Sequence, residues 1–161
     1  MDVYIGVDPG ASGGIVTLNY TEDSKKPILG IYSMPDTEED IWDLFNRISK
    51  TRTNNINAVI EKVGGYIGTQ HPGSRMFNFG VSYGGLRMAM IGNRIPFIET
   101  TPQVWQRHLR IPARGKTESK TQWKNRLKGI AQRLYPGMGI TLKTADALLI
   151  ARYCRLSTSG I

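Results

Sequence analysis

Apolar runs and turn residues alternate at the start of the chain. Val3 to Val7 is an apolar run that ends in Asp8-Pro9-Gly10, and Ile15 to Leu18 resumes a β-type composition after the small residues Ala11 to Gly14. Two such runs around a turn predict a β-hairpin. Residues Ile28 to Met34 predict a third strand.

The apolar positions change to a helical spacing after residue 36. Apolar residues recur at intervals of three and four from Ile41 to Ile48, and Asp36 to Asp40 supplies an N-cap and an acidic first turn. This pattern predicts a helix that ends at about Lys50. Buried strands are predicted next, at Ala58 to Val63 and at Ile95 to Thr100.

Two segments of different character separate those strands. Residues 64 to 74 are rich in Gly and predict an exposed loop, whereas residues 75 to 91 hold enough Met, Phe, Leu and Tyr to predict a largely buried helix. Glycines interrupt that helix at positions 80, 84 and 85. Because a helical Gly costs about 1 kcal/mol relative to Ala, they indicate a close backbone approach, either to the sheet or to a second subunit.

The last third of the chain predicts helices. Pro102 opens a short helix that contains Trp105, residues 110 to 117 form a basic loop, and longer helices follow at residues 118 to 134 and 143 to 156. Strands and helices in this order predict an α/β fold with a mixed central sheet and helices on both faces.

The composition fits one compact domain. The chain has 161 residues and 40% hydrophobic content, so residues 1–161 are expected to form a single domain. Apolar stretches such as residues 145 to 151 fall far below the roughly 20 residues that span a bilayer, and Asp2 stands where a signal peptide is basic. We therefore expect a soluble, cytoplasmic protein without a membrane partner. The single Cys154 is expected to be a small buried hydrophobe.

The charge is strongly basic and unevenly distributed. Lys and Arg number 21 against 13 acidic residues, a formal net charge of +8. Residues 107 to 133 are rich in Lys and Arg, with Glu118 as their one acid, whereas acids crowd residues 36 to 43. A solvated helix face explains part of this pattern, but its one-sidedness favours a polyanionic partner. The residues expected to bind backbone phosphates are Arg114, Lys116, Lys120 and Lys124.

Three acids occupy apolar surroundings. Asp8 ends the first predicted strand, Glu61 lies near the end of the fourth, and Asp146 lies between two alanines of the last helix. Each has an ordinary structural explanation: a turn cap, an ion pair with a lysine, and a helix N-terminal charge, respectively. Buried charges are costly unless they are paired or bind a metal, and carboxylates without clustered His or Cys favour Mg²⁺ or Mn²⁺ over Zn²⁺. Together, on a basic chain, the three acids indicate a nuclease.

Three motifs carry a resemblance to a known family. Ile5-Gly6-Val7-Asp8-Pro9-Gly10, Val59-Ile60-Glu61-Lys62-Val63 and Ala145-Asp146-Ala147-Leu148-Leu149-Ile150-Ala151 resemble, in order and spacing, the motifs of RuvC-type Holliday-junction resolvases. Thr101-Pro102-Gln103-Val104-Trp105, a basic segment and Tyr135-Pro136 are similar to chloroplast and small phage relatives of RuvC. The resemblance covers nearly the whole chain.

This resemblance implies an RNase H-like fold and a two-fold homodimer that cuts four-way DNA junctions symmetrically. It implies that Asp8, Glu61 and Asp146 bind two Mg²⁺ ions, which Mn²⁺ replaces, and that the ions activate a water and stabilise the leaving oxygen. A bacterial cell or a phage-infected host is the expected setting. The glycine-interrupted helix 75 to 91 is the candidate dimer interface, with packing on the sheet as its alternative.

Lys143 departs from the family pattern. RuvC-type enzymes usually have a fourth acid three residues before the last one, on the same helix face, and chloroplast relatives tolerate a histidine there. A lysine does not bind Mg²⁺; it is expected to contact the scissile phosphate or to help place the water, or else to face solvent. This leaves open a non-catalytic junction-binding module beside the nuclease hypothesis, and a nuclease for other branched DNA or for RNA/DNA hybrids.

The loop after Glu61 is expected to reach opened bases near the cut. Its candidate DNA-binding residues are Tyr66, Gln70, His71 and Arg75. A stacked aromatic such as Tyr66 contributes about 1 to 3 kcal/mol per base. His71 and His108 are not needed by a two-metal mechanism.

Overall fold

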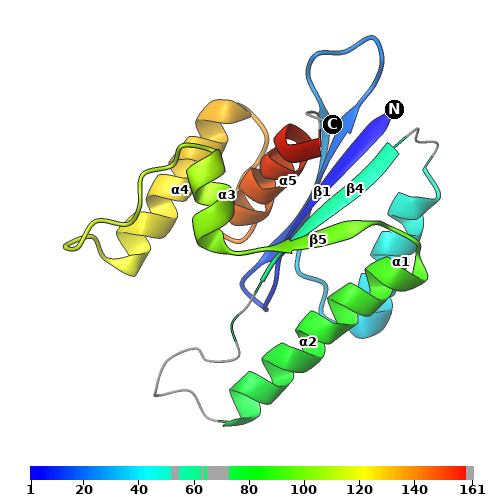
Figure 1. Cartoon of the computed structure of the whole chain (residues 1–161), viewed down its shortest axis with the longest axis horizontal. Coiled ribbons are helices and arrows are strands. Elements are labelled where there is room, and N and C mark those ends of the chain that lie inside the picture. The colour runs from blue at the N-terminus through cyan, green and yellow to red at the C-terminus, as the bar shows by residue number, and fades with distance from the viewer. Residues whose placement is uncertain (52–54, 63, 65–72, 159–161) are drawn as a thin grey trace.

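The computed structural model describes residues 1–51, 55–62, 64 and 73–158. Five strands and five helices follow one another along these residues (Figure 1). The strands are β1 (Asp2–Asp8), β2 (Gly14–Tyr20), β3 (Ile28–Ser33), β4 (Asn55–Glu61) and β5 (Phe97–Thr100). The helices are α1 (Glu38–Ser49), α2 (Gly73–Gly92), α3 (Pro102–His108), α4 (Lys120–Leu134) and α5 (Ala145–Thr158).

The strands form one mixed sheet in the order β3-β2-β1-β4-β5. β1 pairs antiparallel with β2, with Asp8 opposite Gly14, and parallel with β4, with Val7 opposite Ile60. The predicted hairpin and mixed sheet are therefore confirmed. Because parallel strands end at the same edge of a sheet, β1 and β4 place Asp8 and Glu61 at one edge.

Helices cover both faces of the sheet, as predicted (Figure 1). On one face, α3, α4 and α5 enclose a core that includes Trp105, Leu127 and Leu148. On the other face, α1 and α2 contribute to a core that includes Phe45 and Leu86. The sequence pattern and the observed layers agree on an α/β, RNase H-like fold.

Helix α5 lies in direct contact with the middle of β1. A Cβ added to Gly6 would lie 2.0 Å from the carbonyl oxygen of Ala147 and 2.3 Å from the backbone nitrogen of Ala151. Only a glycine permits so close an approach of helix and strand. The contact fixes α5, and with it Asp146, relative to the strand that carries Asp8.

Helix α2 is more exposed than its composition predicts. Only Leu86, Ala89 and Met90 are buried, so the expectation of a largely buried helix was wrong. The apolar residues are not confined to one side of α2, and its N-terminal half continues past the ends of the strands (Figure 1). A Cβ added to Gly80 or Gly84 would meet no atom of the described residues within 4 Å, which excludes an approach to the sheet as their cause.

The predicted start of α1 is confirmed and that of α5 was wrong. The N-cap of α1 is Thr37, within the predicted range Asp36 to Asp40, and its side chain accepts a hydrogen bond from the Asp40 backbone N–H at 3.1 Å. Helix α5 begins at Ala145 and not at residue 143, because a turn closed by Thr141 and Thr144 precedes it. Lys143 therefore lies in this turn and not on a helix face shared with Asp146.

Two smaller expectations concern Cys154 and membrane-spanning helices. Cys154, a residue of α5, is fully buried in the core on that face of the sheet, as predicted. No helix in the described part of the chain combines the length and the hydropathy needed to cross a membrane.

Candidate active site

Asp8 and Glu61 are the terminal residues of their strands. A tight turn follows Asp8, in which the Gly13 N–H donates to the Gly10 carbonyl oxygen at 2.9 Å. Gly10 has a φ of 101°, a left-handed conformation that favours glycine. The Asp8-Pro9-Gly10 motif thus ends the strand and turns the chain sharply, which leaves the Asp8 carboxylate at the sheet edge.

Asp146 approaches the same edge from α5. Asp146 is buried, and its Oδ2 accepts a hydrogen bond from Lys124 Nζ of α4. Its other oxygen, Oδ1, is buried and has no hydrogen-bond partner among the described residues. Burying an unpaired carboxylate oxygen is costly, so this atom is available to a ligand.

The three acids influence one another electrostatically. Burial, followed by the charges of Asp146 and Glu61, raises the pKa of Asp8 from 3.8 to about 8. Burial raises the pKa of Glu61 too, and Asp146 adds to this shift, while a hydrogen bond from Trp105 opposes it. These shifts indicate that the acids lie near one another, and buried groups of like charge so perturbed are typical of functional sites.

Lys124 supplies the positive charge of this site. Burial alone lowers the pKa of its ammonium group, but Asp146, Asp8 and Glu61 raise it by more. Its side chain is 37% exposed, against 7% for that of Asp146. Phosphate binding by Lys124 stays a prediction; in the structure its side chain pairs with the candidate metal ligand Asp146.

Trp105 holds Glu61 in position, a contact that sequence reasoning missed. The fully buried indole of Trp105 donates from Nε1 to Glu61 Oε2 at 2.8 Å. The two residues are 44 positions apart, so no local pattern relates them. The only signal was the place of Trp105 in the Thr101–Trp105 motif.

The donor set suits a hard divalent cation, although the side chains as they lie do not enclose one. Among the described residues, no three acidic, His or Cys side chains form a group that could hold a metal ion. The Lys124 ammonium interacts with all three acids and occupies the place of a counter-cation. The unpartnered Oδ1 of Asp146 and the carboxylates of Asp8 and Glu61 fit Mg²⁺ or Mn²⁺ once the side chains converge.

A cleft of about 740 Å³ opens beside Asp8. One wall is the turn after β1, and a second is the start of α2, where the Phe79 ring lies against Gly10. The predicted site residues Arg75, Lys120, Lys124 and Lys143 also line it. The cleft therefore combines a candidate metal ligand with four cationic side chains.

The other predicted DNA-binding residues lie elsewhere. Arg114 and Lys116 are exposed in the segment between α3 and α4, outside the lining of this cleft. Tyr66, Gln70 and His71 lie outside the described residues.

Comparisons with known proteins identify the fold. No family model and no curated protein sequence matches the chain. The chain is similar to the structure of Thermus thermophilus RuvC, with a TM-score of 0.59 and 15% sequence identity over 98% of this chain and 95% of that one. It is also similar to T. thermophilus RuvC in complex with a Holliday junction substrate, with a TM-score of 0.61 and 15% identity over 99% and 97% of the two chains. The chain therefore has the fold of RuvC along nearly its entire length.

Proposed function

We propose that this protein is a metal-dependent endonuclease that resolves four-way DNA junctions. The observation that carries the proposal is that Asp8 and Glu61 end neighbouring strands at one edge of the sheet, within electrostatic reach of Asp146, and that one buried Asp146 oxygen is left unpartnered. Burial of these charged groups lowers the free energy of unfolding unless a cation binds them, so a cation site explains their placement. The cationic cleft beside them and the RuvC fold favour a DNA phosphate as the substrate.

In the proposed mechanism, Asp8, Glu61 and Asp146 would hold the metal, and a metal bound there would activate a water and stabilise the leaving oxygen of the phosphodiester. Trp105 keeps the Glu61 carboxylate oriented, and the contact of α5 with Gly6 keeps Asp146 beside β1. Lys120 and Lys143, on the cleft wall, hold the phosphate that is cut. Lys124, paired with Asp146, offsets part of the negative charge of the acids.

A cleavage assay on synthetic four-way junctions tests the proposal. We expect nicked duplex products in Mg²⁺ or Mn²⁺ and none in EDTA, and slower cleavage of linear duplex, flaps, forks and RNA/DNA hybrids. Preferred cleavage of a hybrid or a flap would support a nuclease with a different substrate.

Lys143→Asp places an acid where a cation now faces the cleft. It is therefore expected to lower the Mn²⁺ concentration for half-maximal cleavage about tenfold.

A non-catalytic junction-binding protein is the second candidate. The observation in its favour is that Lys124 and Lys143 place two cations beside the acids, where they compete with metal ions. This candidate predicts tight junction binding with no turnover in either metal, and cleavage that appears only in Lys143→Asp. Turnover by the wild type excludes it.

The outward side of α2 supports a homodimer as the functional unit. Phe77, Val81, Met88 and Ile91 are 71%, 45%, 60% and 52% exposed. Together with Gly84 they recur at alternating intervals of four and three residues, which is the spacing of a helix–helix seam. The space above Gly80 and Gly84 admits side chains of a partner helix, and exposed apolar residues that gather on one side of a helix are typical of an interaction surface.

Met88→Lys is therefore expected to convert a dimer into a monomer, because it places a charge in the middle of this seam. Light scattering coupled to size-exclusion chromatography measures the mass. Val104→Lys is the matched control, since Val104 is 47% exposed on α3, across the sheet. A wild-type monomer, or an equal effect of both variants, would contradict the α2 interface.

A further inference from the structure

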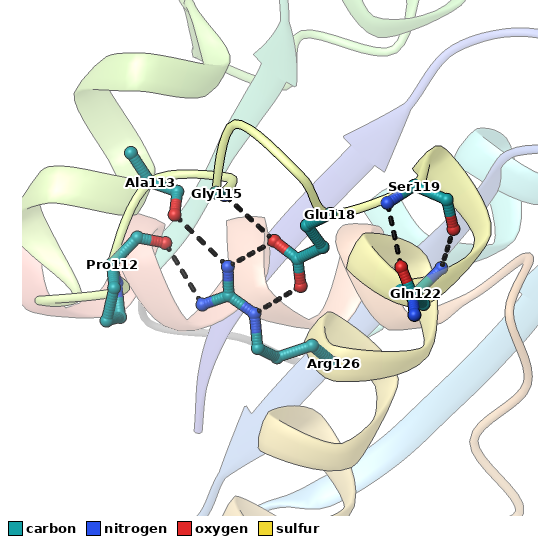
Figure 2. A network of polar contacts seen from close by, with 7 residues as sticks. All are labelled: Pro112, Ala113, Gly115, Glu118, Ser119, Gln122 and Arg126. Carbon is teal, nitrogen blue, oxygen red and sulfur yellow. Dashed lines mark hydrogen bonds and ion pairs between the residues drawn. The ribbon is translucent and has the colours of Figure 1, made fainter.

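One arginine holds the basic segment that precedes α4 (Figure 2). Arg126 Nε and Nη2 donate to the two carboxylate oxygens of Glu118 at 2.9 and 2.8 Å. The same guanidinium donates to the carbonyl oxygens of Pro112 and Ala113 at 3.2 and 3.1 Å. All three nitrogens of the guanidinium are thus engaged within this segment. A fork of donors in one plane is geometry that arginine provides and lysine does not.

Glu118 also forms two hydrogen bonds with the backbone of this segment. Its Oε2 also accepts a hydrogen bond from the Gly115 backbone N–H at 3.1 Å, and the Glu118 N–H donates to the Gly115 carbonyl oxygen at 3.1 Å. Directly afterwards, Ser119 and Gln122 form a reciprocal capping box that starts α4 (Figure 2). Residues 112–118 are therefore tied to the first turns of α4 at several points.

We call the Arg126–Glu118 pair and its bonds to residues 112–118 the clamp. The clamp contacts the hydrophobic core. The Arg126 guanidinium lies 4.4 Å from the ring centroid of Trp123, and Trp123 belongs to the core on the α5 face of the sheet. The side chains of Arg126 and Glu118 are 31% and 18% exposed, so their bonds are partly shielded from water. Displacement of the segment would break these bonds and leave the Arg126 guanidinium without its partners.

The pair adds no net charge to the basic surface. Glu118 neutralises Arg126, whereas Arg114 and Lys116 in the same segment are exposed. An acid in so basic a stretch weakens attraction to a polyanion, so its presence calls for a separate benefit. The contacts show that benefit: a fixed backbone from which Arg114 and Lys116 project.

We propose that Glu118 and Arg126 are positioning residues for DNA binding, and that the clamped segment 112–118 is a preformed contact for a duplex backbone outside the catalytic cleft. The proposal rests on the proposed function for the identity of the ligand. A prefolded segment loses little conformational freedom when it binds, so its charges contribute more affinity than the same charges on a flexible loop.

The sign of the Glu118→Ala effect separates positioning from simple electrostatics. Removal of an acid from a DNA-binding surface strengthens binding if charge alone matters. The clamp predicts the opposite: about tenfold weaker binding to a four-way junction, measured by fluorescence anisotropy in EDTA so that no cleavage occurs. Asp23→Ala, which removes an exposed acid from the β2–β3 connection, is the matched control and is expected to leave binding unchanged or slightly tighter.

Arg126→Lys provides an independent arm that keeps the charge. It is expected to weaken junction binding by a similar factor, with the slope of log affinity against log salt unchanged, because no phosphate contact is removed. Arg133→Lys, later in α4, is its control. By contrast, the double variant Arg114→Ala/Lys116→Ala is expected to reduce that slope by about 2, close to 0.9 for each lost phosphate contact. In both clamp variants, hydrogen exchange at residues 112–118 is expected to quicken, while that of α5 is unchanged.

The outcomes distinguish this proposal from the proposed function. Tighter binding by Glu118→Ala, or faster exchange with unchanged affinity in both clamp variants, overturns the positioning role and leaves the nuclease untouched. If the wild type binds duplex DNA but neither prefers nor cuts junctions, the proposed function fails; weaker duplex binding by both clamp variants then still supports the clamp. A wild type that binds no DNA overturns both.

Discussion

Replacement of Asp8 by Asn is expected to abolish metal-dependent cleavage while making the metal-free protein more resistant to heat. The amide keeps the shape of the side chain but removes a charge that the fold disfavours, since burial and the neighbouring acids raise the pKa of Asp8 to about 8. Loss of one of the proposed metal ligands would remove several kcal/mol of transition-state stabilisation, a rate decrease of about a thousandfold or more.

The pH dependence of this stability gain has a defined sign. An acid whose pKa is higher in the folded state contributes stability that is fully present below its unfolded pKa of about 4. That contribution is lost as the pH rises through the folded pKa of about 8. Thermal unfolding in EDTA should therefore show a small difference between Asp8→Asn and wild type at pH 5, growing to about 2 °C or more at pH 9. A variant that is less stable than wild type at pH 9 would contradict the conclusion that the ionised Asp8 carboxylate destabilises the fold.

Gly6→Ala is expected to have the largest effect on folding. The new methyl group would lie 2.0 and 2.3 Å from backbone atoms of Ala147 and Ala151, and a helix backbone cannot yield as a flexible side chain can. Helix α5 must move away from β1, which we expect to cost about 4 kcal/mol or more in the free energy of unfolding. Urea denaturation monitored by circular dichroism measures the loss.

Gly129→Ala is the control for this substitution. A Cβ at Gly129 in α4 would meet only the guanidinium of Arg133, at 3.6 Å, so alanine is expected to stabilise the helix by up to about 1 kcal/mol. If Gly6→Ala folds with wild-type stability, the close packing of α5 against the sheet is wrong, and with it the placement of Asp146.

Much of the fold could be predicted because its signals are local. The turn at Asp8-Pro9-Gly10 and the apolar spacing from Ile41 to Ile48 each lie within a few residues, and the structure has the hairpin and the helix there. The opening of α3 at Pro102 is equally local. The exposure of α2 could not be predicted, because composition alone does not tell which side of a helix is covered.

The site was predicted less completely, for the same reason. The motifs indicated Asp8, Glu61 and Asp146, but their surroundings depend on contacts between distant segments. The hydrogen bond from Trp105 to Glu61 and the ion pair of Lys124 with Asp146 join residues 44 and 22 positions apart. Glu118 was only a lone acid in a basic stretch until the structure placed it against Arg126.

The two cores on opposite faces of the sheet have a consequence for how such a protein diverges. The acids depend on β1, β4 and the tightly fitted α5, whereas Met88 and Ile91 of α2 project away from the opposite core. Substitutions on that outer surface can accumulate without disturbing the carboxylates. If α2 forms the proposed dimer interface, that interface and the proposed metal site are free to change at different rates in one small chain.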